Sequence, residues 1–150
     1  MPIVGAPRDE ASPAVFGVFD GLTSVIGVLI ALGAAHPAVV VSAVLGLAAA
    51  STMSMAAGEW LSSSDRAIRP ALVMGAATLV GTIMPAVGFM VLGHGAALVV
   101  AGGVSLLLCA GIAWYRSRFE PPVRAWAETF GIFAVAVAVT YLVALATGAA

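Results

Sequence analysis

Five apolar stretches of about 20 residues each dominate the 150-residue chain, and short polar connections separate them. An α-helix rises ~1.5 Å per residue, so about 20 residues cross a hydrocarbon core ~30 Å thick. The sequence therefore predicts an all-α integral membrane protein with five transmembrane helices, forming a single transmembrane domain over residues 1–150. The expected helices cover about residues 13–33, 37–60, 70–92, 96–115 and 126–147.

The composition supports a bilayer as the solvent of this chain. Only 9% of the residues are charged and 62% are hydrophobic, whereas a soluble domain carries about 25% charged residues. The formal net charge of −1 provides no basic patch for nucleic acid. The single cysteine excludes an internal disulfide and a cysteine-based zinc site.

Arginine supplies all the fixed positive charge, and its distribution predicts the orientation. Arginines precede the first span, separate the second from the third, and separate the fourth from the fifth: Arg8, Arg66, Arg69, Arg116, Arg118 and Arg124. Because positive residues are enriched in cytoplasmic connections, we expect this side to be cytoplasmic. Five crossings then leave the N-terminus in the cytoplasm and the C-terminus on the opposite side.

Two local patterns predict details of the helices. Pro85 lies inside the third span and predicts a kink, because proline cannot donate the hydrogen bond that continues a helix. Arg124 and Glu128 are four residues apart at the start of the fifth span, a spacing that predicts a local ion pair.

The first span contains an aspartate, which a bilayer penalises. Residues 14–19 before Asp20 are all apolar, so the carboxylate is expected at depth in the membrane. A charge there costs several kcal/mol unless it is paired, protonated or hydrated. The alternative is that the span begins at Gly21 and Asp20 lies among the lipid headgroups.

Small residues accompany Asp20 along one face of the first span. Gly17, Ser24 and Gly27 follow one another with Asp20 at spacings of three and four, and Gly21 forms a G-x-x-x-G pair with Gly17. Such faces allow two helix backbones to approach closely. We expect a two-fold dimer with this face along its axis, although plain helix packing explains the small residues as well.

The end of the second span offers further metal ligands. Met55 and Glu59 are four residues apart on one face, at a depth comparable to that of Asp20. Carboxylate oxygens with a thioether suit Fe²⁺ or Mn²⁺ better than Mg²⁺ or Ca²⁺, which prefer oxygen alone. One protomer offers too few ligands for a closed site, and a two-fold axis would double them. The simpler alternatives are a core methionine and an interfacial carboxylate.

Two segments resemble the vacuolar iron transporter family: FGVFDGLTSVIGVLIAL in the first span and STMSMAAGEWLSSSDR at the end of the second. That family typically shows "DGL" in its first helix and "S-M-x-x-G-E-[YW]-x-S" at the end of its second. The likeness extends more loosely over the third span, GAATLVGTIMPAVGF, and the fifth, GIFAVAVAVTYLVALATG. Full members insert a glutamate-rich cytoplasmic metal-binding domain between helices two and three. Only residues 62–69 stand there, so the chain is similar to the short branch of the family.

The resemblance implies a homodimer that moves Fe²⁺ or Mn²⁺ out of the cytoplasm in exchange for protons. The family's pathway aspartate and methionine correspond to Asp20 and Met55, and its glutamate to Glu59 as a gate. We expect a transporter rather than an enzyme, with no tightly bound cofactor. The expected location is the cell (inner) membrane, or a vacuolar-type membrane in a eukaryote.

Two alternative functions stay open. A small proton-coupled exporter of organic cations would also place an acid in the first helix, but it should have an aromatic-lined cavity. A non-transporting membrane subunit would need only the small-residue packing faces and neither Asp20 nor Met55.

Overall fold

The computed structural model describes residues 11–32, 35–64 and 66–148, and within these ranges the chain is helical with no strand. The helices in order are α1 (Ala11–Leu32), α2 (Pro37–Ser62), α3 (Ile68–Ala86), α4 (Gly88–Val91), α5 (His94–Arg116) and α6 (Pro122–Thr147). All except the short α4 are long and apolar enough to cross a membrane. The five predicted spans are confirmed, and the chain is a multi-pass membrane protein.

The third predicted span, 70–92, is divided into two helices, α3 and α4. Pro85 lies inside the last turn of α3, and the helix ends at Ala86. The Val87 N–H then reaches only to the Met84 carbonyl, three residues back, at 3.5 Å. The predicted kink is therefore confirmed, and it is sharp enough to end one helix and begin another.

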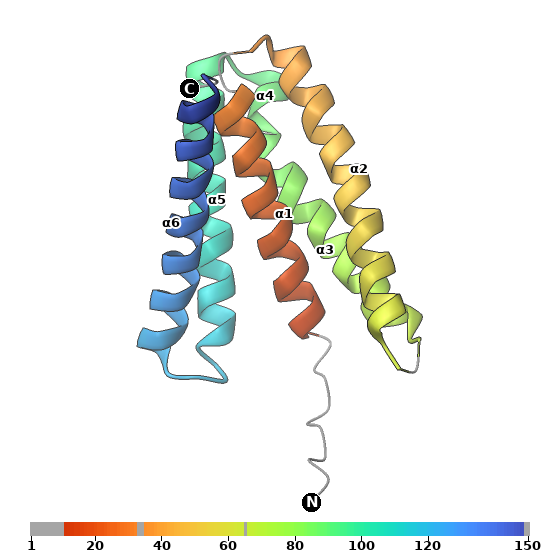
Figure 1. Ribbon diagram of the computed structural model, residues 1–150. Helices are drawn as coiled ribbons and strands as arrows, with labels where there is room; N and C mark the ends of the chain where they lie inside the picture. Colours follow the sequence, from red (N-terminus) through yellow and green to blue (C-terminus); the bar gives the residue numbers. More distant parts are fainter. Residues whose placement is uncertain (1–10, 33–34, 65, 149–150) are drawn as a thin grey trace, which may run out of the picture.

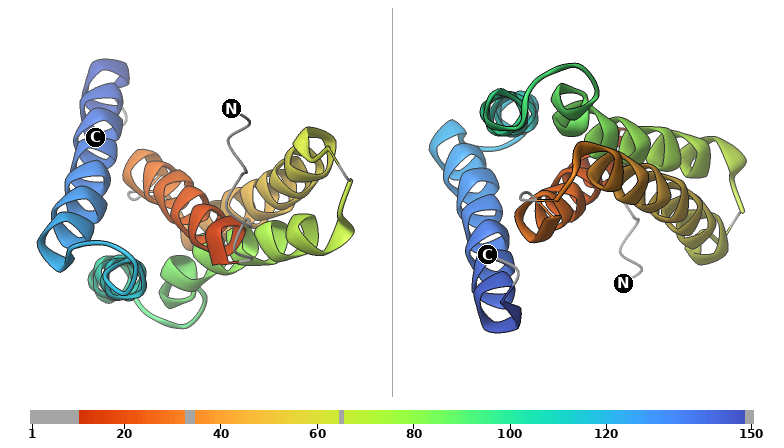
Figure 2. Two further views of the ribbon diagram at one scale, coloured as in Figure 1. Left: turned by 90° about the horizontal axis from the view of Figure 1, so that it is seen from below. Right: turned by 90° about the horizontal axis from the view of Figure 1, so that it is seen from above.

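The helices run alternately up and down, with α1 in the middle of the bundle (Figure 1). Seen along the bundle, α1 lies between α6 on one side and the α2–α3 pair on the other (Figure 2). We call the end that carries the α2–α3 and α5–α6 connections the arginine end, because the arginines that the structure describes gather there: Arg66, Arg69, Arg116, Arg118 and Arg124. Arg8 lies outside the described residues. The predicted clustering of these five arginines on one side is confirmed.

The closest helix contact is between α1 and α3, and glycine makes it possible. A Cβ built on Gly17 would lie 2.5 Å from the Met74 carbonyl oxygen, and one on Gly21 would collide with the Thr78 carbonyl. From the other side, a Cβ on Gly81 of α3 would collide with the main chain of Val18. Three missing side chains thus bring the two backbones into direct contact, as small residues do in membrane helices.

Two apolar clusters hold the remaining helices together. One, nearer the far end of the bundle, includes Val25 of α1, Val44 of α2 and Phe89 of α4. The other joins Leu22 of α1 to Cys109 of α5 and Phe133 of α6. The outside of the bundle is also apolar: Val99, Leu107 and Val123 are 76%, 73% and 83% exposed. Lipid is the solvent that such a surface requires.

Candidate functional site

Asp20 lies on α1, nine residues past its first residue, or about 14 Å along the helix axis. The residue is half-buried. Its carboxylate makes no hydrogen bond or ion pair with any residue that the structure describes. The nearby Thr23 hydroxyl does not serve it, because that hydroxyl donates to the main-chain carbonyls of Phe19 and Asp20 at 3.0 and 3.1 Å. Asp20 is thus an acid within a candidate span, with no neutralising partner in the described part of the chain.

The small residues of α1 do not all face the same neighbour. Gly17 and Gly21 are buried against α3 within the same chain, whereas the sequence pattern assigned them to a contact between two copies. Ser24 is half-buried, on the side of Asp20. Gly27 faces α6, where an added Cβ would lie 3.4 Å from the Thr140 methyl carbon. The surface that one chain leaves for a second copy is therefore narrower than the sequence stripe, and it centres on Asp20 and Ser24.

Met55 and Glu59 are both half-buried on α2, in its last two turns before the arginine end. The Ser63 hydroxyl lies 2.7 Å from the main-chain carbonyl oxygen of Glu59 and 3.4 Å from its Oε1. That long second contact leaves most of the acceptor capacity of the carboxylate free. Glu59 can therefore offer oxygen to a cation, with the Met55 thioether one turn deeper.

One chain does not bring the three predicted ligands together. None of the hydrogen bonds of the described residues joins Asp20 to the α2 pair, and these residues contain no group of three or more His, Cys, Asp or Glu side chains that could hold a metal ion. Helices α1 and α2 lie close at the far end and diverge toward the arginine end (Figure 1). Asp20 and the Met55–Glu59 pair thus lie on two helices that separate toward the arginine end.

A further polar group on α2, the Thr52 hydroxyl, was not predicted as part of the site. The Thr52 hydroxyl is buried and has no hydrogen-bond partner in the described part of the chain. Most threonines in helices donate to the carbonyl four residues back, as Thr78 and Thr82 do here. Thr52, which lies three residues before Met55, instead packs against Gly75 where α2 meets α3. No sequence signal distinguishes it from the other threonines.

An ion-pair network joins α5 to α6 at the arginine end. Arg116 of α5 donates to Glu128 at 2.7 Å and to Thr129 at 3.1 Å, and its Nε lies 2.7 Å from Glu120. The predicted pair of Arg124 with Glu128 is present at 2.7 Å. The sequence indicated this local pair but not the bridge from Arg116, because its partners on α6 are 12 and 13 residues away and meet only when the hairpin closes.

The comparison with known families matches the part of the chain that contains these residues. Residues 11–68 match the VIT family. This segment is similar to the VIT family, and it makes up less than half of the 150-residue chain. It comprises α1, α2 and their connection to α3, and it holds Asp20, Met55 and Glu59. No curated protein and no solved structure gives a significant match to the chain.

The VIT family is a family of membrane transporters for metals and other ions. The family-matched helices are also those that carry the half-buried acid and the free thioether. The connection between α2 and α3 is only a short turn, from Ser62 to Ile68, so the chain has no room for a domain at that point.

Proposed function

We propose that this chain exports divalent iron or manganese from the cytoplasm by exchange for protons. The observation that carries the proposal is the Asp20 carboxylate, which lies about 14 Å into α1 with no partner among the described residues. An unpaired acid at such depth is costly, and acids retained within spans mark ion pathways and proton relays. A helix that only packs against its neighbours does not require an aspartate at this position.

The chemistry follows from the two forms of the carboxyl group. Without a metal, the desolvated Asp20 holds a proton and is neutral. A divalent cation that arrives from the arginine end displaces this proton, because the cation can bind only the ionised form. The Met55 thioether adds a soft donor that first-row metals accept and Mg²⁺ or Ca²⁺ do not prefer. Glu59, nearer the arginine end, acts as the gate that first receives the cation.

A second copy of the chain completes the ligand set in this proposal. Asp20 and Ser24 lie on the uncovered side of α1, so a two-fold axis beside them would bring two carboxylates together. The test replaces Ser24 by cysteine and applies a short thiol crosslinker to membranes. The native Cys109 is buried and gives no background. Ser24→Cys should give a crosslinked dimer, while Val99→Cys on the exposed side of α5 should not. If neither crosslinks and the protein is a monomer in bilayers, the shared site is wrong.

The proposed direction of transport requires the arginine end to face the cytoplasm, in the cell (inner) membrane or a vacuolar-type membrane. A reporter inserted near Ser64, at the α2–α3 connection, should be active in the cytoplasm. One fused after Ala150 should be active on the opposite side. A cytoplasmic signal from both positions would contradict a five-span topology.

The function is tested by metal tolerance in cells that lack their own exporter. The parent should restore growth at high Mn²⁺ or Fe²⁺, and Asp20→Asn, which keeps the shape but removes the charge, should not. Ser54→Asn is the control, because it adds the same amide at an exposed position of α2 that the proposed site does not include. Membrane levels of each variant are measured alongside. Normal tolerance with Asp20→Asn would contradict a role for Asp20 in transport, and failure of the parent to restore growth would favour a non-transporting subunit.

The organic-cation alternative has one observation in its favour, an aromatic-lined cavity between α1 and the α5–α6 hairpin. Asp20 is not among the residues that line this cavity. The carboxylate that does line it, Glu120, is paired with Arg116 at 2.7 Å. The cavity therefore has no uncompensated negative charge to attract a lone cation, and metal transport is the function that we prefer.

A further inference from the structure

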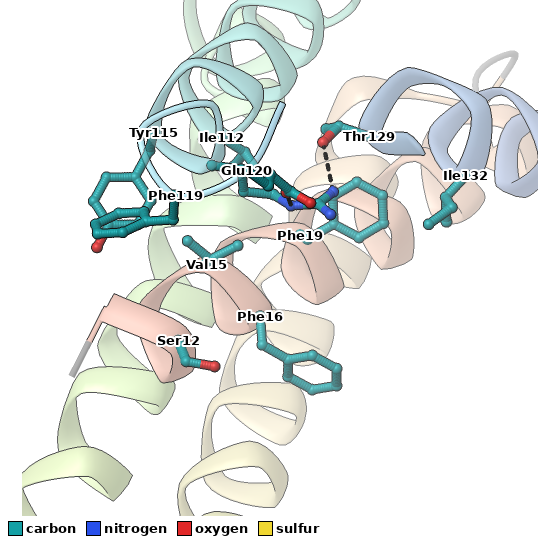
Figure 3. Close-up of a pocket in the computed structure, with 11 residues that line it drawn as sticks. Ser12, Val15, Phe16, Phe19, Ile112, Tyr115, Phe119, Glu120, Thr129 and Ile132 are labelled. Atoms are coloured by element: carbon teal, nitrogen blue, oxygen red, sulfur yellow. Dashed lines mark hydrogen bonds and ion pairs between the residues drawn. The ribbon is translucent and has the colours of Figure 1, made fainter. Parts of the chain in front are cut away.

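The cavity at the arginine end has a volume of about 510 Å³. Its walls are the first two turns of α1, the last turn of α5 with the residues that follow it, and the start of α6 (Figure 3). Pockets of roughly 300–1,000 Å³ accommodate ligands of drug size. This cavity is separate from the proposed metal ligands, because none of Asp20, Met55 and Glu59 lines it.

The lining has one aromatic and one charged part. Phe16 and Phe19 of α1 line the cavity together with Tyr115 and Phe119, and the ring centroids of the last two are 5.3 Å apart. In Figure 3 the Tyr115 and Phe119 rings lie at one edge of the cavity and Ile132 at the opposite edge, with Glu120 between them. An occupant that suits this lining is amphipathic, with an apolar part along the rings and a polar part at the charges.

The charges of the lining cancel. Arg116 and Glu120 are 2.7 Å apart, and their side chains are 27% and 25% exposed, so an occupant can reach both. The neighbouring pair of Arg124 and Glu128 is also neutral as a unit. A lone anion or a lone cation would have to break an existing ion pair. A zwitterion offers an anionic group to Arg116 and a cationic group to Glu120 at the same time, so it suits this lining.

The position of the cavity along α1 and α5 indicates that its occupant is a lipid of the bilayer. The cavity begins at Ser12, the first residue of the α1 candidate span, and includes Arg116, the last of the α5 span. On α6, one turn away, Trp126 stacks on Phe130 with centroids 5.7 Å apart, as interfacial aromatic residues do. The charged part thus lies at headgroup level. Phe16 and Ile132, 57% and 56% exposed, continue the lining toward the surrounding lipid.

We propose that this cavity binds a zwitterionic phospholipid. Its phosphate lies on the Arg116 guanidinium, which favours phosphate oxygens. Its ammonium group lies beside Glu120 and the faces of the aromatic rings, which attract such cations. The upper part of one acyl chain follows Phe16 and Ile132. This site does not depend on the proposed metal transport.

The test measures lipid retention by native mass spectrometry on the purified full chain in mild detergent. The probes are dioleoyl phosphatidylcholine, which is zwitterionic, and dioleoyl phosphatidylglycerol, which is anionic. The parent should retain the first over the second. Glu120→Gln leaves Arg116 and Arg124 to share Glu128, so one positive charge is in excess. The ratio should therefore shift about fivefold toward phosphatidylglycerol, the size expected for one charge at a membrane surface. Glu59→Gln, which removes the same charge on α2 outside the cavity, should leave the ratio unchanged.

A second pair of variants tests the cavity itself. Ile132→Trp fills it and should abolish retention of phosphatidylcholine, while Val135→Trp, at a 62% exposed position on the same helix outside the lining, should not. Unfolding temperatures in detergent verify that both variants fold. Equal retention of the two lipids by the parent, or full retention by Ile132→Trp, overturns the proposal. So does stabilisation by phosphocholine alone, because the occupant would then be a water-soluble zwitterion.

Discussion

The two sides of α1 differ in how closely other parts of the chain pack against them. On one side, Gly17 and Gly21 press against the main-chain carbonyls of Met74 and Thr78 in α3, with no space for a methyl group. On the other, Asp20 and Ser24 are only half-buried, and the Asp20 carboxylate has no partner among the described residues. One helix thus combines a closed face that fixes the fold with an open face that is available for chemistry. Stability and transport should therefore respond to different residues of the same helix.

The largest effect should come from filling the closed face. Gly21→Leu forces a side chain into the Thr78 carbonyl and the Thr82 hydroxyl, so α1 and α3 must separate. Overpacking costs ~1–3 kcal/mol where side chains can yield, and a backbone cannot, so we expect loss of the folded protein. Ser24→Leu, three residues along on the open face, should fold. Size-exclusion profiles and unfolding temperatures in mild detergent show whether each variant is folded. A stable Gly21→Leu variant would mean that the α1–α3 contact is not as described.

A smaller effect should come from Met55 on α2. Met55→Leu keeps the volume and removes the thioether, and such swaps usually cost under about 1.5 kcal/mol of stability. We expect the unfolding temperature to change little and Fe²⁺ or Mn²⁺ transport to fall roughly tenfold, the lower range for disturbed metal sites. Met53→Leu, at a 70% exposed position of α2, is the matched control. Equal transport by both variants would show that Met55 is not a metal ligand of the pathway.

The smallest effect should come from Glu59. Glu59→Gln removes a charge near the arginine end, where water can replace a lost ligand at a typical cost of about 1 kcal/mol or less, which is a factor of about five. Transport should therefore fall by about fivefold or less, mainly at low metal concentration, while the maximal rate changes little. Rates measured over a range of Mn²⁺ concentrations separate these two effects. Complete loss of transport would make Glu59 a core ligand instead of a gate.

Much of the fold could be predicted from sequence because lipid imposes simple rules. The five spans follow from apolar length, the break near Ala86 from Pro85, and the Arg124–Glu128 pair from helical spacing. The G-x-x-x-G pair on α1 correctly indicated close helix contact. Its partner could not be read from the sequence, because a glycine face fits any neighbouring backbone equally well.

The candidate site could be predicted only in part for a similar reason. Asp20 stands out in the sequence because lipid penalises it wherever its helix packs. Thr52 and Arg116 do not stand out, since their roles depend on which side chains the folded helices bring near them. The Thr52 hydroxyl is noticeable only because α3 covers it. The cavity beside Arg116 exists only where α1 meets the α5–α6 hairpin.

The central claim is that Asp20 exchanges a metal for a proton, and one measurement tests it directly. Purified protein is reconstituted into vesicles, and Mn²⁺ uptake and internal pH are recorded together, with and without an imposed pH gradient. We expect the parent to move Mn²⁺ one way and protons the other, and the gradient to accelerate uptake. Asp20→Asn should lose both fluxes, and Ser54→Asn, at an exposed position of α2, should keep both. Mn²⁺ and proton fluxes through Asp20→Asn equal to those of the parent would contradict the claim.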